Sequence, residues 1–296
     1  MDKKKLMLLI NPVAGRGGFR SNLGDVLEVF SNAGYLTTVY MTEYVGHATE
    51  IAATEAVHYD LLVCMGGDGT LSEVVSGVMR MDDAVPIGYI PMGTANDVAS
   101  TLSLPKQPVK AAQKIVEGSP MPFDVGEFDN AGYFTYIAAF GAFTEVSYAT
   151  SQQIKHTIGH LAYVLEGMRH IPSLSPMNAK IIYDDGIIDD EFIFGAVTNS
   201  TSIAGLIKLD EGIVELGDGL FEMILVRNPR GFLDINILIS DVLSRNFQSA
   251  YVSVLHTRAV RFVFDREVTW TRDGENGGSY RDIELINHHA AVKFVV

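Results

Sequence analysis

A five-residue segment at positions 66–70, with the sequence Gly-Gly-Asp-Gly-Thr, combines the residue types best suited to binding phosphate. Glycines let the backbone approach a ligand closely and adopt positive φ angles, and free N–H groups at the start of a helix attract anions. The carboxylate of Asp68 would repel phosphate unless a cation or a proton-transfer role offset its charge. The segment therefore favours a nucleotide site with a divalent metal, although a tight strand-to-helix turn has the same composition.

A second candidate for chemistry lies near the C-terminal end, where Asp273 and Glu275 flank Gly274. Either carboxylate could accept the proton of a hydroxyl that attacks a phosphate. Asp-Gly is also a strong hairpin-turn signal. The pattern alone leaves both interpretations open.

The elements around the glycine segment predict how it is positioned. Residues 61–65 are continuously apolar, as in a strand buried on both faces, and a helical spacing of apolar residues begins at Leu71. The same order of apolar strand, loop and helix recurs along the chain, so that Asn11, Thr42 and Thr94 also follow apolar runs. Because ligands collect at the carboxyl ends of parallel strands, all four loops are expected at one sheet edge. The other predicted strands are residues 6–10, 36–41 and 86–90.

The fold class predicted from this alternation is a two-domain protein. Residues 1–124 are expected to form a nucleotide-binding α/β domain, a parallel sheet with helices on both faces. Residues 125–296 are expected to form a mostly antiparallel β-sandwich, because short strand-like runs there are separated by turn residues. This second domain carries Asp273 and Glu275 and is expected to bind the molecule that accepts the phosphate. Two helices, at about 151–171 and 232–244, interrupt it. The predicted strands are residues 133–140, 178–183, 191–198, 220–226, 259–264, 283–286 and 291–296.

Composition limits the class of partner. The chain has 36 acidic and 22 basic residues, which argues against nucleic-acid binding and against strong docking on anionic membranes. Its only cysteine, Cys64, excludes an internal disulfide and fits the cytoplasm. No apolar run reaches the roughly 18 residues of a spanning helix.

Five motifs, taken in order, resemble those of the diacylglycerol kinase-like superfamily, which includes diacylglycerol, sphingosine and ceramide kinases and bacterial soluble lipid kinases. NAD kinases carry a near relative of the Gly-Gly-Asp-Gly-Thr segment, but the order and spacing of all five motifs are more specific. The motifs are Asn-Pro at 11–12, Thr42 with Gly-His-Ala at 46–48, Gly-Gly-Asp-Gly-Thr at 66–70, Pro-Met-Gly-Thr-Ala-Asn-Asp at 91–97 and Asp-Gly-Glu at 273–275.

The resemblance implies an ATP- and Mg²⁺-dependent lipid kinase that phosphorylates a hydroxyl of a neutral lipid, most directly diacylglycerol, to give phosphatidic acid. It implies that Glu275, or its rival Asp273, is the base that accepts the hydroxyl proton, and that Asp68 works with magnesium. The nucleotide contacts that it implies are Asn11, Thr42, Gly66, Gly67, Asp68, Gly69, Thr70, Leu71, Ser72 and Thr94.

A structural magnesium site is also implied by the resemblance of residues 217–222 to a metal-binding segment of the family. Asp218, Glu215 and the backbone at Leu220 are the corresponding ligands, and oxygen ligands suit Mg²⁺. A turn before a strand is the alternative.

Other functions stay open from the sequence. The acceptor could instead be a sphingoid base or a soluble molecule of the NAD type, and a non-catalytic nucleotide- or lipid-binding protein is a further alternative. A cytoplasmic enzyme that meets its lipid substrate transiently at the membrane surface is expected, and a homodimer through exposed strand edges is conceivable.

Overall fold

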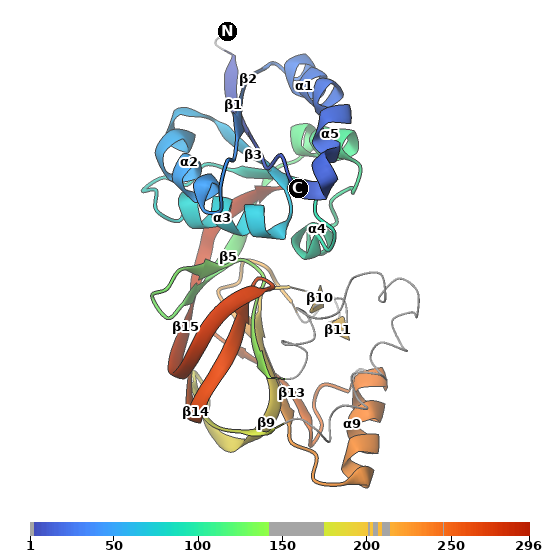
Figure 1. Cartoon of the computed structure of the whole chain (residues 1–296), viewed down its shortest axis with the longest axis vertical. Coiled ribbons are helices and arrows are strands. Elements are labelled where there is room, and N and C mark those ends of the chain that lie inside the picture. The colour runs from blue at the N-terminus through green and yellow to red at the C-terminus, as the bar shows by residue number, and fades with distance from the viewer. Residues whose placement is uncertain (1–2, 142–174, 201, 204–206, 209–213, 245) are drawn as a thin grey trace. The chain divides into compact units, whose positions relative to one another are not determined.

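The computed structural model describes residues 3–141, 175–200, 202–203, 207–208, 214–244 and 246–296. The chain divides into two compact units (Figure 1). Unit 1 comprises Met1–Val125, Leu216–Asp218 and His288–Val296, and unit 2 comprises Gly126–Glu215 and Gly219–Asn287. The predicted division at 124/125 treats each domain as one continuous stretch. Two later segments, residues 216–218 and 288–296, return to unit 1, where their partners lie far away in the sequence.

Most strands of the unit 1 sheet carry apolar residues that are buried on both faces, whereas residues 35–41, at the edge of the sheet, are half-buried or exposed. β1 (Lys4–Ile10) pairs in parallel with β2 (Tyr35–Met41) and β3 (Leu61–Gly66), and β3 pairs in parallel with β4 (Ile87–Pro91). Phe294, near the end of β15 (Glu275–Val295), pairs in parallel with Ile87. The sequence did not indicate that this C-terminal segment joins the N-terminal sheet.

Helices connect these strands and contribute to the core of unit 1. They are α1 (Leu23–Asn32), α2 (His47–Glu55), α3 (Asp68–Val78), α4 (Asp97–Thr101) and α5 (Pro108–Glu117), with 3₁₀ turns η1 (Ala14–Ser21) and η2 (Ala56–His58). Phe30 of α1 and Ile115 of α5 pack in one cluster with Leu8 and Val63. Met7, whose side chain alternates with these, is also fully buried, so both faces of the sheet are covered.

α3 begins three residues earlier than the apolar spacing predicts. The N–H of Leu71 donates to the carbonyl oxygen of Gly67 at 3.0 Å, which places residues 68–70 in the first helical turn. Apolar periodicity detects a helix only from its first core residue, here Leu71, and polar residues of the first turn escape it.

Unit 2 is rich in antiparallel strands, as predicted for the C-terminal part. Its strand order is β13-β12-β9-β7-β14-β15, and β8 pairs with both β9 and β14, so these strands form one continuous sheet rather than two separate ones. β5 (Pro120–Phe128) belongs to unit 1 up to Val125 and to unit 2 from Gly126. The other strands of unit 2 are β6 (Tyr133–Phe134), β7 (Ile137–Gly141), β8 (Met177–Tyr183), β9 (Gly186–Thr198), β12 (Phe221–Arg227), β13 (Val252–Thr257) and β14 (Ala259–Arg272). β10 (Ser202–Ile203) pairs antiparallel with β11 (Ile207–Lys208) in a separate two-stranded sheet.

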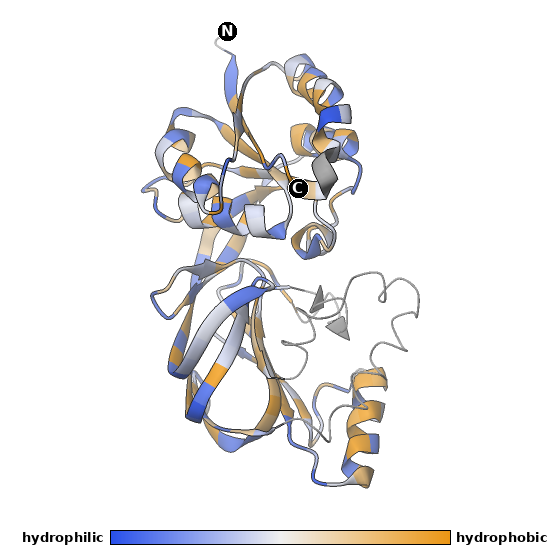
Figure 2. Ribbon diagram, in the orientation of Figure 1, coloured by the Kyte–Doolittle hydropathy of each residue, from blue (hydrophilic) through white to orange (hydrophobic). Residues whose placement is uncertain are grey.

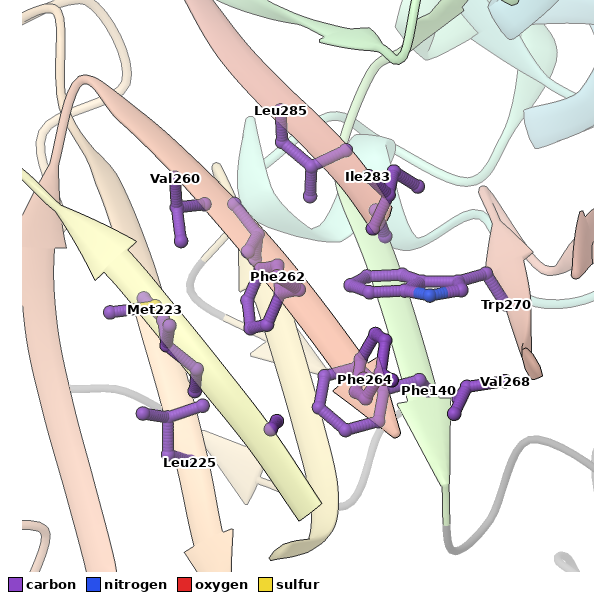
Figure 3. Close-up of a cluster of buried hydrophobic side chains, with 14 of the residues drawn as sticks. Phe140, Met223, Leu225, Val260, Phe262, Phe264, Val268, Trp270, Ile283 and Leu285 are labelled. Atoms are coloured by element: carbon purple, nitrogen blue, oxygen red, sulfur yellow. The ribbon is translucent and has the colours of Figure 1, made fainter. Parts of the chain in front are cut away.

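Aromatic side chains fill the core of unit 2 (Figure 3). Trp270 packs against Phe140 and Phe262, with ring centroids 4.8 and 5.2 Å apart. Phe264 completes this group at 5.0 Å from Phe140. These contacts join β7 to both halves of β14 and hold the end of β14, beyond which Asp273 lies.

α9 (Phe232–Ser244) has the bounds predicted from the sequence. The other predicted helix, at 151–171, lies outside the described residues. Among the helices that the structure describes, none is long and apolar enough to cross a membrane.

Candidate active site

Four loops in unit 1 begin at the carboxyl ends of neighbouring strands. Asn11 follows β1, and its N–H donates to the carbonyl oxygen of Met65 in β3 at 3.1 Å. The N–H of Thr42, after β2, donates to Ile10 at 2.9 Å. Thr94 lies in an exposed loop after β4. The strand ends therefore bring Asn11, Thr42, the glycine segment and Thr94 to one edge of the sheet.

The glycines at this edge allow backbone to pack directly against backbone. A Cβ atom on Gly93 would lie 2.8 Å from the Cα of Gly67, closer than real Cβ atoms approach other atoms. Gly15 has φ +56°, and a Cβ there would lie 2.5 Å from the carbonyl oxygen of Met92. Larger residues at these positions would push the three loops apart, so the sequence requires glycine here.

Thr70 is fixed from two directions. A Cβ on Gly66 would lie 2.7 Å from the Cβ of Thr70. The amide Nδ2 of Asn11 donates to Thr70 Oγ1 at 2.8 Å, and Asn11 Oδ1 accepts the N–H of Val13 at 3.1 Å. Asn11 therefore ties the first loop to the first turn of α3, a positioning role besides any contact with a nucleotide.

Asp68 opens α3, and its carboxyl group has a raised pKa. Burial raises its pKa above the usual range, and the N–H groups of Asn96, Asp97 and Val98 at the start of α4 offset only part of that rise. Its Oδ1 is shielded from solvent and has no hydrogen-bond partner among the described residues. A buried carboxyl oxygen without a partner fits a bound cation or a water molecule held by one.

The donor set around Asp68 suits magnesium better than a metal held by protein alone. The described part of the chain contains no group of three or more His, Cys, Asp or Glu side chains that could hold a metal ion. Mg²⁺ at nucleotide sites is commonly bound by one or two carboxylates, with phosphates and water completing its shell. Asp68 alone is sufficient for that arrangement.

Asn96 braces the loop after β4. It has φ +54°, its Nδ2 donates to the carbonyl oxygen of Gly93 at 2.8 Å, and its Oδ1 accepts the hydroxyl of Tyr89 at 3.4 Å. Although Asn96 precedes α4, its side chain does not cap this helix. The bonds to Gly93 and Tyr89 instead fix the loop that presents Thr94.

Glu73 is a site-supporting residue that the sequence did not reveal. From the second turn of α3, its carboxylate accepts the N–H of Gly46 at 2.8 Å and of Ala48 at 3.1 Å. A carboxylate at the start of α2 is favoured by the helix dipole. Glu73 thereby holds the segment that follows Thr42. Its partners are 27 and 25 residues away in the sequence, so no local pattern indicates the contact.

In unit 2, Asp273 is buried in the turn between β14 and β15. Its carboxylate accepts backbone N–H groups of Thr135 at 2.7 Å, Tyr136 at 3.0 Å and Ile137 at 3.2 Å. Its φ of +47° is a left-handed conformation that aspartate tolerates in turns. The carboxylate of Asp273 is committed to three donors, which makes it an anchor of the turn.

Glu275, two residues later, has the opposite environment. It is the first residue of β15, and its exposed side chain makes no hydrogen bond or ion pair with any described residue. Its carboxylate is therefore free to meet a substrate hydroxyl. Of the two predicted candidates for the base, Glu275 is the available one.

The three predicted ligands of a structural magnesium do not belong to one unit. Asp218 lies in unit 1, whereas Glu215 and Leu220 lie in unit 2. Within unit 1, the N–H of buried Asp124 donates to Leu216 at 2.8 Å, and Asp124 Oδ1 accepts the N–H of Ala290 at 2.6 Å. Asp124, which the sequence did not single out, fixes the segment that carries Asp218. The metal site itself stays a prediction.

Comparison with known proteins gives consistent matches. Residues 5–128 match the family model of the diacylglycerol kinase catalytic domain. The chain is 33% identical over 277 residues to a diacylglycerol kinase of Bacillus subtilis (strain 168), covering 93% of this chain and 91% of that protein. It is 32% identical over 280 residues to a diacylglycerol kinase of Staphylococcus aureus (strain MRSA252), covering 93% and 87%.

Solved structures show the same fold. A crystal structure of a diacylglycerol kinase from Bacillus anthracis str. Sterne superposes with a TM-score of 0.81 at 23% identity, covering 100% of this chain and 97% of that one. At this identity, the likeness concerns the fold alone.

Proposed function

Because this chain belongs to the diacylglycerol kinase family and is a lipid kinase, we propose that it transfers the γ-phosphate of ATP to the free hydroxyl of diacylglycerol, which yields phosphatidic acid and ADP. The observation that carries this proposal is Asp68, whose shielded Oδ1 has no partner among the described residues and stands at the start of a helix in a glycine-rich loop. Such a carboxyl group would serve a magnesium-bound triphosphate.

The triphosphate is assigned to the first turns of α3 and the loop before it. Backbone N–H groups at a helix start favour anions, and the close packing at Gly66 and Gly67 leaves backbone rather than side chain facing the ligand. Asn11, Thr42 and Thr94 at the same sheet edge are assigned to the rest of the nucleotide, with Gly69, Leu71 and Ser72 completing the loop.

Magnesium is assigned to Asp68, and a second, structural ion to Asp218, Glu215 and the carbonyl at Leu220. When bound beside ATP, Mg²⁺ neutralises charge on the transferred group. The contribution of Asp68 is to hold one negative charge at the loop. Burial raises the pKa of Asp68 toward the neutral form, and nearby backbone N–H groups compensate its charge only in part.

Glu275 is assigned as the general base. As the acceptor oxygen attacks the γ-phosphorus, Glu275 takes the hydroxyl proton, the bond to the bridging oxygen of ADP breaks, and the phosphate ester forms. Asp273 sets the position of Glu275 by anchoring the turn to residues 135–137. Positioning and electrostatics supply most of the acceleration in phosphoryl transfer, so this small set of groups is sufficient.

Transfer of label from γ-labelled ATP to diacylglycerol, a sphingoid base and NAD, measured side by side in detergent micelles, tests the assignment. We expect diacylglycerol to take the label. If only the sphingoid base or only NAD takes the label, that molecule replaces diacylglycerol as the assigned acceptor. ATP binding without transfer to any of the three would indicate a non-catalytic binding protein.

For its setting in the cell, we propose the cytoplasm with transient contact to the membrane. The supply of ATP there and the buried, unpaired Cys64 support this proposal. A homodimer and the absence of a nucleic-acid partner stay predictions.

A further inference from the structure

α9 in unit 2 consists largely of hydrophobic residues (Figure 2), and several of its large apolar side chains are exposed. The side chains of Phe232 and Leu233 are 80% and 76% exposed, and those of Ile237 and Leu243 are 48% and 49% exposed. Helical spacing places these four residues on one side of the helix. Leu238 and Asp241, the buried residues of α9, lie on the other side.

The exposed side of α9 carries no charged residue. The residues interspersed there are Asn236, Ser240 and Ser244. Asn236 Nδ2 donates to the carbonyl oxygen of Phe232 at 2.8 Å, and the Ser244 hydroxyl donates to Ser240 at 2.7 Å. The side-chain donors of Asn236 and Ser244 are thus bonded to carbonyl oxygens of the helix, which lowers the cost of removing them from water.

The two acidic residues of α9 are held away from this side. Asp234 accepts the N–H of Arg230 at 3.0 Å, and buried Asp241 accepts Nδ2 of Asn246 at 3.0 Å. The outer side of a solvated helix normally carries charge, especially in a chain of which 20% of the residues are charged. An uncharged, apolar outer side is instead typical of a helix that lies in a membrane interface.

A neutral lipid surface fits this face better than a second copy of the chain does. A 13-residue helix is about 20 Å long and about 10 Å wide, so the face offers roughly 200 Å². A stable protein interface needs about 800 Å² per partner. Charge also favours a neutral lipid surface. α9 has no Lys or Arg and the chain has a net charge of −14, so binding to anionic lipid headgroups is disfavoured.

We propose that the exposed face of α9 docks this enzyme on its substrate membrane by inserting Phe232, Leu233 and Ile237 into neutral or zwitterionic lipid. The inference rests on the proposed function, since it assumes an acceptor dissolved in a bilayer. It adds the surface that reaches the bilayer and the class of lipid that this surface prefers.

The test is flotation of the full chain with phosphatidylcholine vesicles that contain diacylglycerol, at low and high salt. The variants Leu233→Glu and Ile237→Glu are expected to lower the bound fraction roughly tenfold or more, because each places a charge in the acyl region. The control, Ile187→Glu, replaces an apolar residue of β9 that is 61% exposed, and is expected to bind like the wild type. Binding of the wild type is expected to survive high salt.

Insertion itself can be followed by fluorescence. Phe232→Trp adds an exposed indole, whereas Trp270 is fully buried and gives a constant background. We expect a blue shift of the added emission with neutral vesicles. Wild-type binding by Leu233→Glu and Ile237→Glu, or binding only to anionic vesicles and only at low salt, would overturn the proposal.

Two further measurements separate this inference from the proposed function and from other occupants. The α9 variants should transfer phosphate to a short-chain diacylglycerol in detergent micelles as well as the wild type does. If the wild type itself transfers no phosphate in that assay, the kinase assignment fails, and the result says nothing about membrane docking. If sedimentation shows that the variants turn a dimer into a monomer, or if their melting temperature falls well below that of Ile187→Glu, the face is covered by protein and the proposal fails.

Discussion

Substitutions that remove the charge of Asp273 or Glu275 without a change in size should have different effects on stability and on activity. In Asp273→Asn, one amide oxygen can still accept the N–H groups of Tyr136 and Ile137, but an amide NH₂ faces the N–H of Thr135. A hydrogen bond to a charged group contributes about 1.5–3 kcal/mol, and an unsatisfied buried donor costs about 1–3 kcal/mol. We therefore expect a loss of about 3–5 kcal/mol in unfolding free energy.

Glu275→Gln should lower activity and leave stability unchanged. Its side chain is exposed and makes no bond to a described residue, so the melting temperature should stay within about 1 °C of the wild type. Loss of a general base lowers kcat by about 100- to 10,000-fold. Asp273→Asn should instead melt roughly 10 °C lower, because each kcal/mol shifts the midpoint of a domain of this size by about 2–4 °C.

Differential scanning calorimetry and kcat for diacylglycerol in micelles measure the two effects. Glu267→Gln is the matched control, an exposed glutamate on β14 that should change neither quantity. The assignment is refuted if Glu275→Gln keeps near wild-type kcat while Asp273→Asn abolishes turnover without a fall in melting temperature.

Three further variants test unit 1. Gly66→Ala forces a Cβ to within 2.7 Å of Thr70, and should raise KM for ATP at least tenfold in steady-state kinetics, whereas Gly24→Ala, with open space around it in α1, should raise the melting temperature. Glu73→Ala leaves two N–H groups of the α2 start without their carboxylate and should lower the unfolding free energy by about 2 kcal/mol in urea titration, with Glu73→Gln losing less. Asp68→Asn should abolish transfer. Because burial raises the folded-state pKa of Asp68 above its unfolded value near 3.8, the stability contributed by this group is present below that value and is lost as the pH rises through the folded pKa. The melting temperature of Asp68→Asn relative to the wild type, measured without magnesium, should therefore increase from pH 4 to 7, and a flat difference would contradict the role of burial.

The parts of the fold predicted from sequence are those with local, one-dimensional signals. Residues 6–10 of β1 and 61–65 of β3 are buried apolar runs, and α9 has helical spacing with clear ends. The C-terminal part of β15 was predicted as two strands, because the polar residues 287–289 interrupt the apolar pattern. The backbone nevertheless continues through them as one strand.

The parts that escaped prediction depend on contacts between distant segments. The return of residues 216–218 and 288–296 to unit 1 depends on bonds such as those of Asp124 to Leu216 and Ala290, 92 and 166 residues away in the sequence, respectively. The capping of α2 by Glu73 is of the same kind. Hydrophobic periodicity carries no information on such pairs, since it records only which face of an element is buried.

The acidic motif shows what burial adds to a sequence pattern. Asp-Gly-Glu presents two carboxylates of the same chemistry, so composition and spacing cannot rank them. Folding places Asp273 against three backbone N–H groups and leaves Glu275 exposed. A residue whose acceptor sites are filled by the protein cannot also take a substrate proton without giving up that bonding. The contacts of Asp273 support the turn interpretation for that residue, whereas the base interpretation stays a prediction, which we assign to Glu275. Asp273 makes the turn, and the turn presents Glu275.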